Sequence, residues 1–290
     1  MTALILSVFA STLIFVIFKL FSKYGVNTMQ AIIINYFAAC LCGLFFYSEP
    51  ITISKIPTYP WFYYTLVLGA LFIIVFNLMA ITTQRSGLSV VSVATKMSVG
   101  IPIVFGLLYY KESLGILKSA GILLALVAVY LASIKTKDGI AIKKKNLIFP
   151  LLVFLGSGII DTSIKFLEDA FVAEQDVPLF SATIFSAAAF IGILVLITQA
   201  IQGKFKFEFK NVIGGIALGI PNYFSIYFIV KALRSDLLDS SGIFTVNNVA
   251  IVMISTFVGI LFFKEKLLPK NWLGIVLAVV SIFLVALGTW

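Results

Sequence analysis

Long apolar runs separated by short polar breaks make up almost the whole chain. Each run holds about 20 residues, the length of helix that crosses about 30 Å of hydrocarbon. We therefore predict an all-α integral membrane protein with ten transmembrane helices. The runs cover residues 2–22, 28–47, 60–82, 87–110, 114–134, 147–168, 178–201, 212–232, 240–263 and 268–289.

The breaks between these runs carry turn and charge signals, such as Lys23-Tyr24-Gly25 and Ser48-Glu49-Pro50. Because the breaks are short, consecutive helices are expected to be antiparallel neighbours with no soluble domain between them. Trp61, Trp272 and Trp290 lie at the ends of runs. We expect these three residues to anchor the helices at the membrane interfaces.

Composition excludes a soluble fold for this chain. Hydrophobic residues account for 61% of it and charged residues for 11%, with a mean hydropathy of +1.13. A soluble protein with that composition would need a largely apolar surface. We interpret the first 25 residues as a helix of the mature protein rather than a cleaved signal. The net charge of +9 is expected to face lipid headgroups at helix ends in the cell membrane, and no nucleic-acid partner is expected.

Metal, cofactor and hydrolytic chemistry are not expected. The chain has no His, the commonest general base and metal ligand, and its two cysteines, Cys40 and Cys42, share one apolar run. Two thiols alone complete neither a metal site nor a disulfide framework. We expect no catalytic residues, no metal and no cofactor.

A basic linker, Lys135 to Lys145, divides the chain into halves of similar length, and the halves resemble each other. Tyr109-Tyr110-Lys111-Glu112 with Gly121 matches Phe262-Phe263-Lys264-Glu265 with Gly274 at an offset of 153 residues. We predict one five-helix repeat over 1–140 and a second over 141–290. Because five is odd, the second copy enters the membrane from the opposite side, as an inverted repeat.

These motifs carry a resemblance to a known family. The stretch from Ser98 to Pro102, then Lys111-Glu112-Ser113-Leu114, then Gly121, resembles the signature that ends each repeat of the drug/metabolite transporter superfamily. The ten-helix EamA-like branch is the most similar in helix number and length, over the full chain. Ser255 stands where the first repeat has Pro102. The resemblance implies export or exchange of metabolites, often amino acids, through a central cavity.

The orientation of the chain stays open at this stage. Of the 20 Lys and Arg residues other than Lys96, 14 lie in or beside the loops after helices 1, 3, 5, 7 and 9. The positive-inside rule then places the central linker in the cytoplasm and both termini outside. The family resemblance implies cytoplasmic termini instead.

An ionisable residue inside a membrane span is a functional candidate, since placing it there costs about 2.5–3.5 kcal/mol. Lys96 is the strongest case, lying near the middle of run 87–110 with Ser92 one turn before it. Asn247 and Asn248 occupy the corresponding place in the second half. We expect the two polar stripes to face one midplane cavity, where Lys96 meets a substrate carboxylate. The alternative is a buried ion pair without a substrate role.

Asp161 is the other charged candidate, on a stripe with Ser157 and Lys165 at helical spacing. It could pair locally with Lys165, form a salt bridge to Lys96 that opens during transport, or carry a coupling proton. Weaker candidates either line the cavity or bridge helices by hydrogen bonds. These are Asn77, Asn222, Tyr223 and Tyr227. Residues that kink or thin helices could act as hinges or as packing sites: Pro102, Gly156, Gly158 and Pro221.

The leading hypothesis is a secondary transporter for small metabolites that works by alternating access, with amino acids or related carboxylates as substrates. The chain has no G-x-x-x-x-G-K-[ST] motif, so coupling to protons or other ions, or exchange, replaces ATP. Efflux of cationic amphipathic drugs is the first alternative. A channel and a membrane enzyme are further alternatives, and a monomer and a homodimer both stay open.

Overall fold

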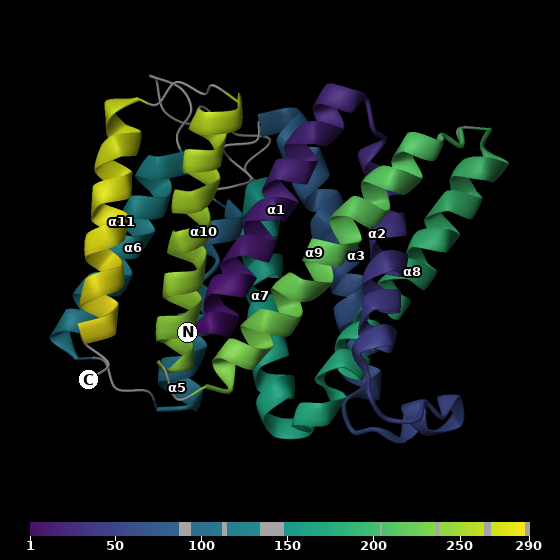
Figure 1. Ribbon diagram of the computed structural model, residues 1–290, viewed down its shortest axis with the longest axis horizontal. Coiled ribbons are helices and arrows are strands. Elements are labelled where there is room, and N and C mark those ends of the chain that lie inside the picture. Colours follow the sequence, from purple (N-terminus) through teal and green to yellow (C-terminus); the bar gives the residue numbers. More distant parts are fainter. Residues whose placement is uncertain are drawn as a thin grey trace. The chain divides into compact units, whose positions relative to one another are not determined.

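The computed structural model describes residues 1–86, 94–111, 115–133, 148–203, 205–235, 238–263 and 268–287. Throughout these ranges the ordered elements are helices and none is a β-strand (Figure 1). In chain order they are α1 (Thr2–Tyr24), α2 (Thr28–Phe46), the 3₁₀ helix η1 (Ile53–Thr58), α3 (Phe62–Ser86), α5 (Gly100–Tyr109), α6 (Ile116–Ser133), α7 (Ile148–Phe171), the 3₁₀ helix η3 (Glu174–Asp176), α8 (Val177–Ile201), α9 (Phe209–Leu233), α10 (Ser240–Phe263) and α11 (Pro269–Leu287).

Within the described ranges, seven helices are long and apolar enough to cross a membrane: α2, α3, α7, α8, α9, α10 and α11. Three shorter apolar stretches, Thr2–Phe18, Ala94–Tyr109 and Ile116–Leu131, fall within the remaining predicted runs. The chain is thus an all-helical, multi-pass membrane protein. The full count of ten spans stays a prediction.

The helices form two compact units. Unit 1 contains Met1–Val8, Asn77–Thr162 and Lys231–Trp290, and unit 2 contains Phe9–Phe76 and Ser163–Val230. Each unit therefore combines helices from both halves of the sequence. Compactness and sequence duplication are different properties, so this division leaves the predicted repeats over 1–140 and 141–290 untested.

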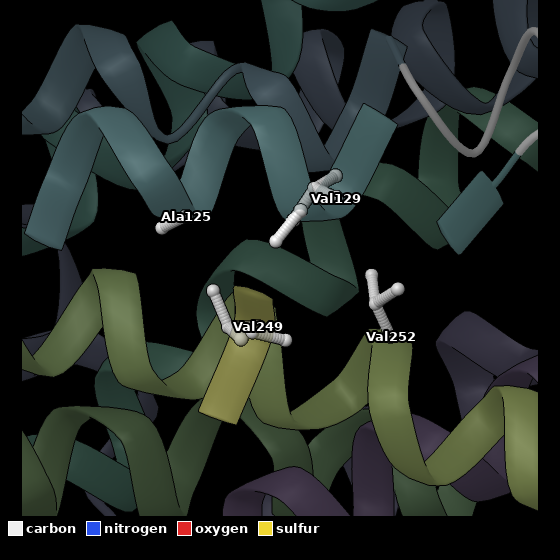
Figure 2. Packing of buried hydrophobic residues seen from close by; sticks show 6 residues of the cluster. Ala125, Val129, Val249 and Val252 are labelled. Carbon is white, nitrogen blue, oxygen red and sulfur yellow. The ribbon is translucent and has the colours of Figure 1, made fainter. Parts of the chain in front are cut away.

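Unit 1 is held together by close packing of α6 against α11 and by contacts of α10 with α5, α6 and α11. Ala125 and Val129 of α6 face Val249 and Val252 of α10 in its buried core (Figure 2). The small side chains allow the helix axes to approach closely, which is how helices associate where lipid removes the hydrophobic driving force.

In unit 2, α2 packs along α8 and also meets α9. A Cβ atom on Gly219 of α9 would lie 2.6 Å from the Asn35 carbonyl oxygen of α2 and 2.6 Å from the Ala38 Cβ. No larger residue fits at that distance without a shift of backbone. Gly219 is therefore a contact point between these two helices.

The tryptophans do not behave alike. Trp61 is fully buried, stacked on Tyr59 with ring centroids 4.8 Å apart and edge-on to Phe180 at 5.7 Å. The prediction that Trp61 anchors a helix at the lipid interface is wrong, because neighbouring aromatic rings cover it. Trp272 is 53% exposed, as an anchor requires. Trp290 lies outside the described residues.

Candidate functional site

Lys96 of unit 1 lies in the helical stretch 94–97, just before α5, and only 7% of it is exposed. Its Nζ donates a hydrogen bond to the side-chain oxygen of Asn248, on α10, at 3.2 Å. The amide nitrogen of Asn248 in turn donates to the Phe244 carbonyl at 3.0 Å, which points the amide oxygen toward Lys96. A buried ammonium and a buried amide thus join two helices at one point.

The helical stretch that contains Lys96 ends at Met97, one residue further on. Ser98 and Val99 form a turn, and α5 begins at Gly100. Pro102 has no N–H and so cannot make the usual helical bond to the carbonyl of Ser98, and the N–H of Ile101 bonds to that carbonyl at 2.9 Å instead. Run 87–110 was expected as one helix, and its described part forms one apolar helical stretch, Ala94–Tyr109, with this turn at Ser98 and Val99. Residues 87–93, including Ser92, lie outside the described ranges.

A carboxylate accompanies Lys96 in unit 1. Asp161 of α7 is partly buried, and its charge attracts that of Lys96. Ser157, one turn earlier on α7, is 8% exposed. The carboxylate predicted on the polar stripe of α7 therefore acts electrostatically on Lys96 within this unit.

Two buried oxygens, on the residues next to Lys96 and Asn248 in sequence, have no hydrogen-bond partner in the part of the chain that the structure describes. They are the side-chain oxygen of Asn247 and the hydroxyl of Thr95. Each is the sequence neighbour of a residue in the Lys96–Asn248 bond. Buried polar atoms in native proteins normally have partners, so each of these two oxygens has hydrogen-bonding capacity left for a further group.

The other predicted site residues are divided between the two units. Asn77 of α3 is partly buried in unit 1, whereas Asn222, Tyr223 and Tyr227 of α9 belong to unit 2. The amide of Asn222 donates to the side-chain oxygen of Asn35 at 3.0 Å. This bond is of the helix-bridging kind, one of the two alternatives for Asn222.

Tyr223 is fully buried and stacks on Phe46 and Tyr227, with ring centroids 6.1 and 5.7 Å apart. Its hydroxyl has no hydrogen-bond partner among the described residues. Tyr223 thus contributes packing through its ring and one unused polar atom to unit 2.

The predicted hinge residues differ in their surroundings. A Cβ atom on Gly158 of α7 would overlap the side chain of Ile101, next to the helix break. Gly156 is partly buried on the same helix, and Pro221 lies inside α9, which continues past it. Gly158 is therefore a close-packing position, and movement at any of the four residues stays a prediction.

The sequence analysis missed an ion pair in unit 1 between Lys118 of α6 and Asp239, the residue before α10. Lys118 is fully buried, and Asp239 also caps α10 by accepting from the Gly242 N–H at 3.0 Å and the Ser241 hydroxyl at 3.2 Å. Two signals in the sequence were available. Lys118 lies just inside run 114–134, and Asp239 followed by Ser240 at the start of run 240–263 is typical of a helix N-terminus.

Lys165 of unit 2 forms ion pairs with Glu168 at 3.5 Å and Asp169 at 3.7 Å. Glu168 is 2% exposed. The local pair predicted for Lys165 was with Asp161, one turn earlier, whereas these two pairs lie in the following turn. Both geometries are favourable on a helix, and sequence spacing alone does not choose between them.

No family model matches the chain. An uncharacterised protein of Haemophilus influenzae is 29% identical to it over 291 residues, covering 97% of this chain and 96% of that protein. A crystal structure of a protein superposes with a TM-score of 0.75 at 12% identity, covering 99% of this chain and 97% of the other. At that identity the likeness shows the fold alone, and it does so over nearly the full length of both chains.

Proposed function

We propose that this protein is a secondary transporter of small metabolites, with amino acids or related carboxylates as the substrate class. One observation carries the proposal: a buried lysine among apolar helices, bonded to Asn248 and attracted to Asp161, beside a helix break. Burying an ionisable side chain in a membrane span is costly. Lys96 differs from the buried Lys118, whose partner is the carboxylate of Asp239, because its acceptor Asn248 is uncharged.

The chemistry of the cluster fits a carboxylate. An ammonium is a donor only, and its bond to a neutral amide oxygen is weaker than a bond to an anionic oxygen. A substrate carboxylate can therefore replace Asn248 as the acceptor of Lys96. Asn247 and Thr95 supply buried oxygens for the remaining polar groups of that substrate.

Alternating access is supported by signs of duplication in the fold. Unit 2 consists of segments beginning at Phe9 and Ser163, and the next segments of unit 1 begin at Asn77 and Lys231. Both pairs of starting points are 154 residues apart, close to the offset of the sequence repeat. In addition, α6 packs on α11 and α2 on α8, and each pair joins helices that the predicted inverted repeat makes equivalent. We infer ten spans in two inverted repeats, working in the cell membrane.

Efflux of cationic drugs is the competing function. It needs an unneutralised acidic group to meet the cation. Asp161 and Lys96 attract each other, so each offsets part of the other's charge. A carboxylate is favoured because the acceptor of Lys96, Asn248, is uncharged and an anionic oxygen binds an ammonium more strongly.

The test is the melting temperature of the purified protein with amino acids, organic acids, sugar phosphates and cationic drugs, for the native chain and for Lys96→Met. A ligand that binds only the folded state raises this temperature. We expect carboxylates to stabilise the native chain and not the variant, followed by saturable flux of the same compounds in liposomes. Equal stabilisation of both proteins by cationic amphiphiles would replace this function with drug efflux. Flux without saturation or counterflow would indicate a channel.

A further inference from the structure

One end of unit 2 carries basic and aromatic side chains on two segments joined by hydrogen bonds. Residues 23–27 comprise the end of α1 and the turn after it, and residues 205–210 lead into the start of α9. We call these two segments the 23–27/205–210 surface. Its exposed cations are Lys23, Lys206 and Lys210. Its exposed rings are Tyr24 at 63%, Phe205 at 36%, and Phe207 and Phe209 at 69% each.

The two parts of this surface are joined by buried amides. Gln30 donates to the Lys206 carbonyl at 3.0 Å and accepts from Asn211 at 2.7 Å. Asn211 accepts from the N–H of Asn27 at 2.8 Å, and Asn27 accepts from the N–H of Gln30 at 3.2 Å. Gln30 and Asn211 are 5% and 2% exposed. The network holds the backbone of both segments, so the lysines and rings project from a fixed base.

A lysine of the second segment lies close to the backbone of the first segment. The Nζ of Lys210 lies 3.7 Å from the position that a Cβ on Gly25 would occupy. Gly25 has φ +61°, which ends α1 and turns the chain toward α2. The only acidic residue in the two segments is Glu208, which pairs with Lys210 at 2.7 Å. Three cations against one anion leave the surface positive.

The exposed rings specify the kind of partner. Phe205, Phe207 and Phe209 alternate with Lys206, Glu208 and Lys210 along the chain. Apolar rings and lysines together at the end of apolar helices suit the headgroup level of a bilayer, where rings meet acyl chains and ammonium groups meet phosphates.

We propose that the 23–27/205–210 surface binds the headgroups of anionic phospholipids. A free phosphate accounts for the lysines but not for the rings. This end of unit 2 then faces the anionic cytoplasmic leaflet. That assignment agrees with the positive-inside count, since the two segments follow the first and seventh predicted spans. The proposal is independent of what the protein transports.

The experiment measures melting temperature in detergent during titration with short-chain phosphatidylglycerol, with phosphatidylcholine and inorganic phosphate as parallel titrations. Three proteins are compared: the native chain, Lys206→Gln/Lys210→Gln, and the control Lys55→Gln. Lys55 is an exposed lysine of η1, outside the proposed surface. We expect phosphatidylglycerol alone to stabilise the native chain and the control. We expect at least tenfold weaker apparent affinity in the double variant, because each lysine near an anionic surface contributes about fivefold.

Equal weakening by Lys55→Gln, or equal stabilisation by phosphatidylcholine or by phosphate, would overturn the proposal. Two further measurements apply whether or not the double variant folds. Raising the salt concentration must weaken the effect of phosphatidylglycerol on the native chain, since exposed charges are screened. Phe207→Ser must weaken it without changing the response to salt. If stabilisation by phosphatidylglycerol changed neither with salt concentration nor in Phe207→Ser, the lipid-binding surface would be contradicted.

Discussion

The Nζ of Lys96 donates to the side-chain oxygen of Asn248 at 3.2 Å, across 152 residues of sequence. This bond joins the stretch before α5 to α10 inside an apolar unit, with the charge of Asp161 acting on the same ammonium. An ammonium held by a neutral acceptor can exchange it for an anionic one. The first prediction concerns this exchange.

Lys96→Met is expected to reduce carboxylate binding by roughly tenfold to a hundredfold, since a hydrogen bond to a charged group contributes about 1.5–3 kcal/mol. Binding is followed by the ligand-dependent shift in melting temperature, and transport by flux into liposomes. Lys55→Met, which changes an exposed lysine of η1, is the control and should behave as the native chain. Native-like flux in Lys96→Met would leave Lys96 as a structural residue.

Lys96 and Asn248 should be energetically coupled. In a cycle of Lys96→Met, Asn248→Leu and the double variant, we expect a coupling free energy of unfolding between about 0.6 kcal/mol, the average between membrane helices, and about 1.7 kcal/mol, the maximum. The measurement is reversible unfolding in mixed micelles. Additive effects of the two substitutions would show that the bond at 3.2 Å adds no stability.

The Lys118–Asp239 ion pair should stabilise unit 1 more than an exposed pair stabilises unit 2. Lys118→Met leaves the capping residue Asp239 without its cation, and we expect it to lower the free energy of unfolding by about 1–3 kcal/mol. This loss is smaller than for a fully buried pair because the Asp239 side chain is 26% exposed. Lys118→Met/Asp239→Asn should recover part of it. The matched control is Lys210→Met, whose pair with Glu208 has both side chains nearly half exposed and should cost little. Equal melting temperatures for the two single variants would count against the buried pair.

Alanine substitutions should destabilise the protein at glycines that contact a neighbouring helix and should be tolerated at glycines with open space beside them. Gly219→Ala places a Cβ within 2.6 Å of the Asn35 carbonyl and should destabilise unit 2 by about 1–3 kcal/mol, the usual cost of overpacking. Gly100→Ala meets nothing within 4 Å and should be neutral or slightly stabilising. Thermal unfolding of both variants gives the comparison. Tolerance of alanine at position 219 would mean that α2 and α9 are free to separate.

The break at Ser98 and Val99 should depend on Pro102. Pro102→Ala restores an N–H that can bond to the Ser98 carbonyl, so the helix should become continuous and more stable. If the break serves movement, turnover in liposomes should fall while substrate affinity changes little. Hydrogen exchange at Ile101 and Ile103 reports on the helix. Faster exchange there after the substitution would contradict this account of the break.

Helix positions followed closely from the pattern of apolar residues. The predicted run 28–47 corresponds to α2, and run 240–263 coincides with α10. Lys96 and Asp161 were found in the same way, because a charge in an apolar run stands out whatever it contacts. A bilayer requires each helix to satisfy its own backbone and to present about 20 apolar residues to lipid. Both requirements are local and can be read from one segment at a time.

Pairing between helices is not local, and only the tertiary structure decided it. Asn248 as the acceptor for Lys96, Asn35 as the acceptor for Asn222, and Asp239 as the anion for Lys118 each lie more than 100 residues away in sequence. Trp61 is buried for the same reason, since Phe180 of a different helix covers it. Periodicity tells which face of a helix is polar, but the face that it meets depends on how side chains of all neighbouring helices fill the space between them.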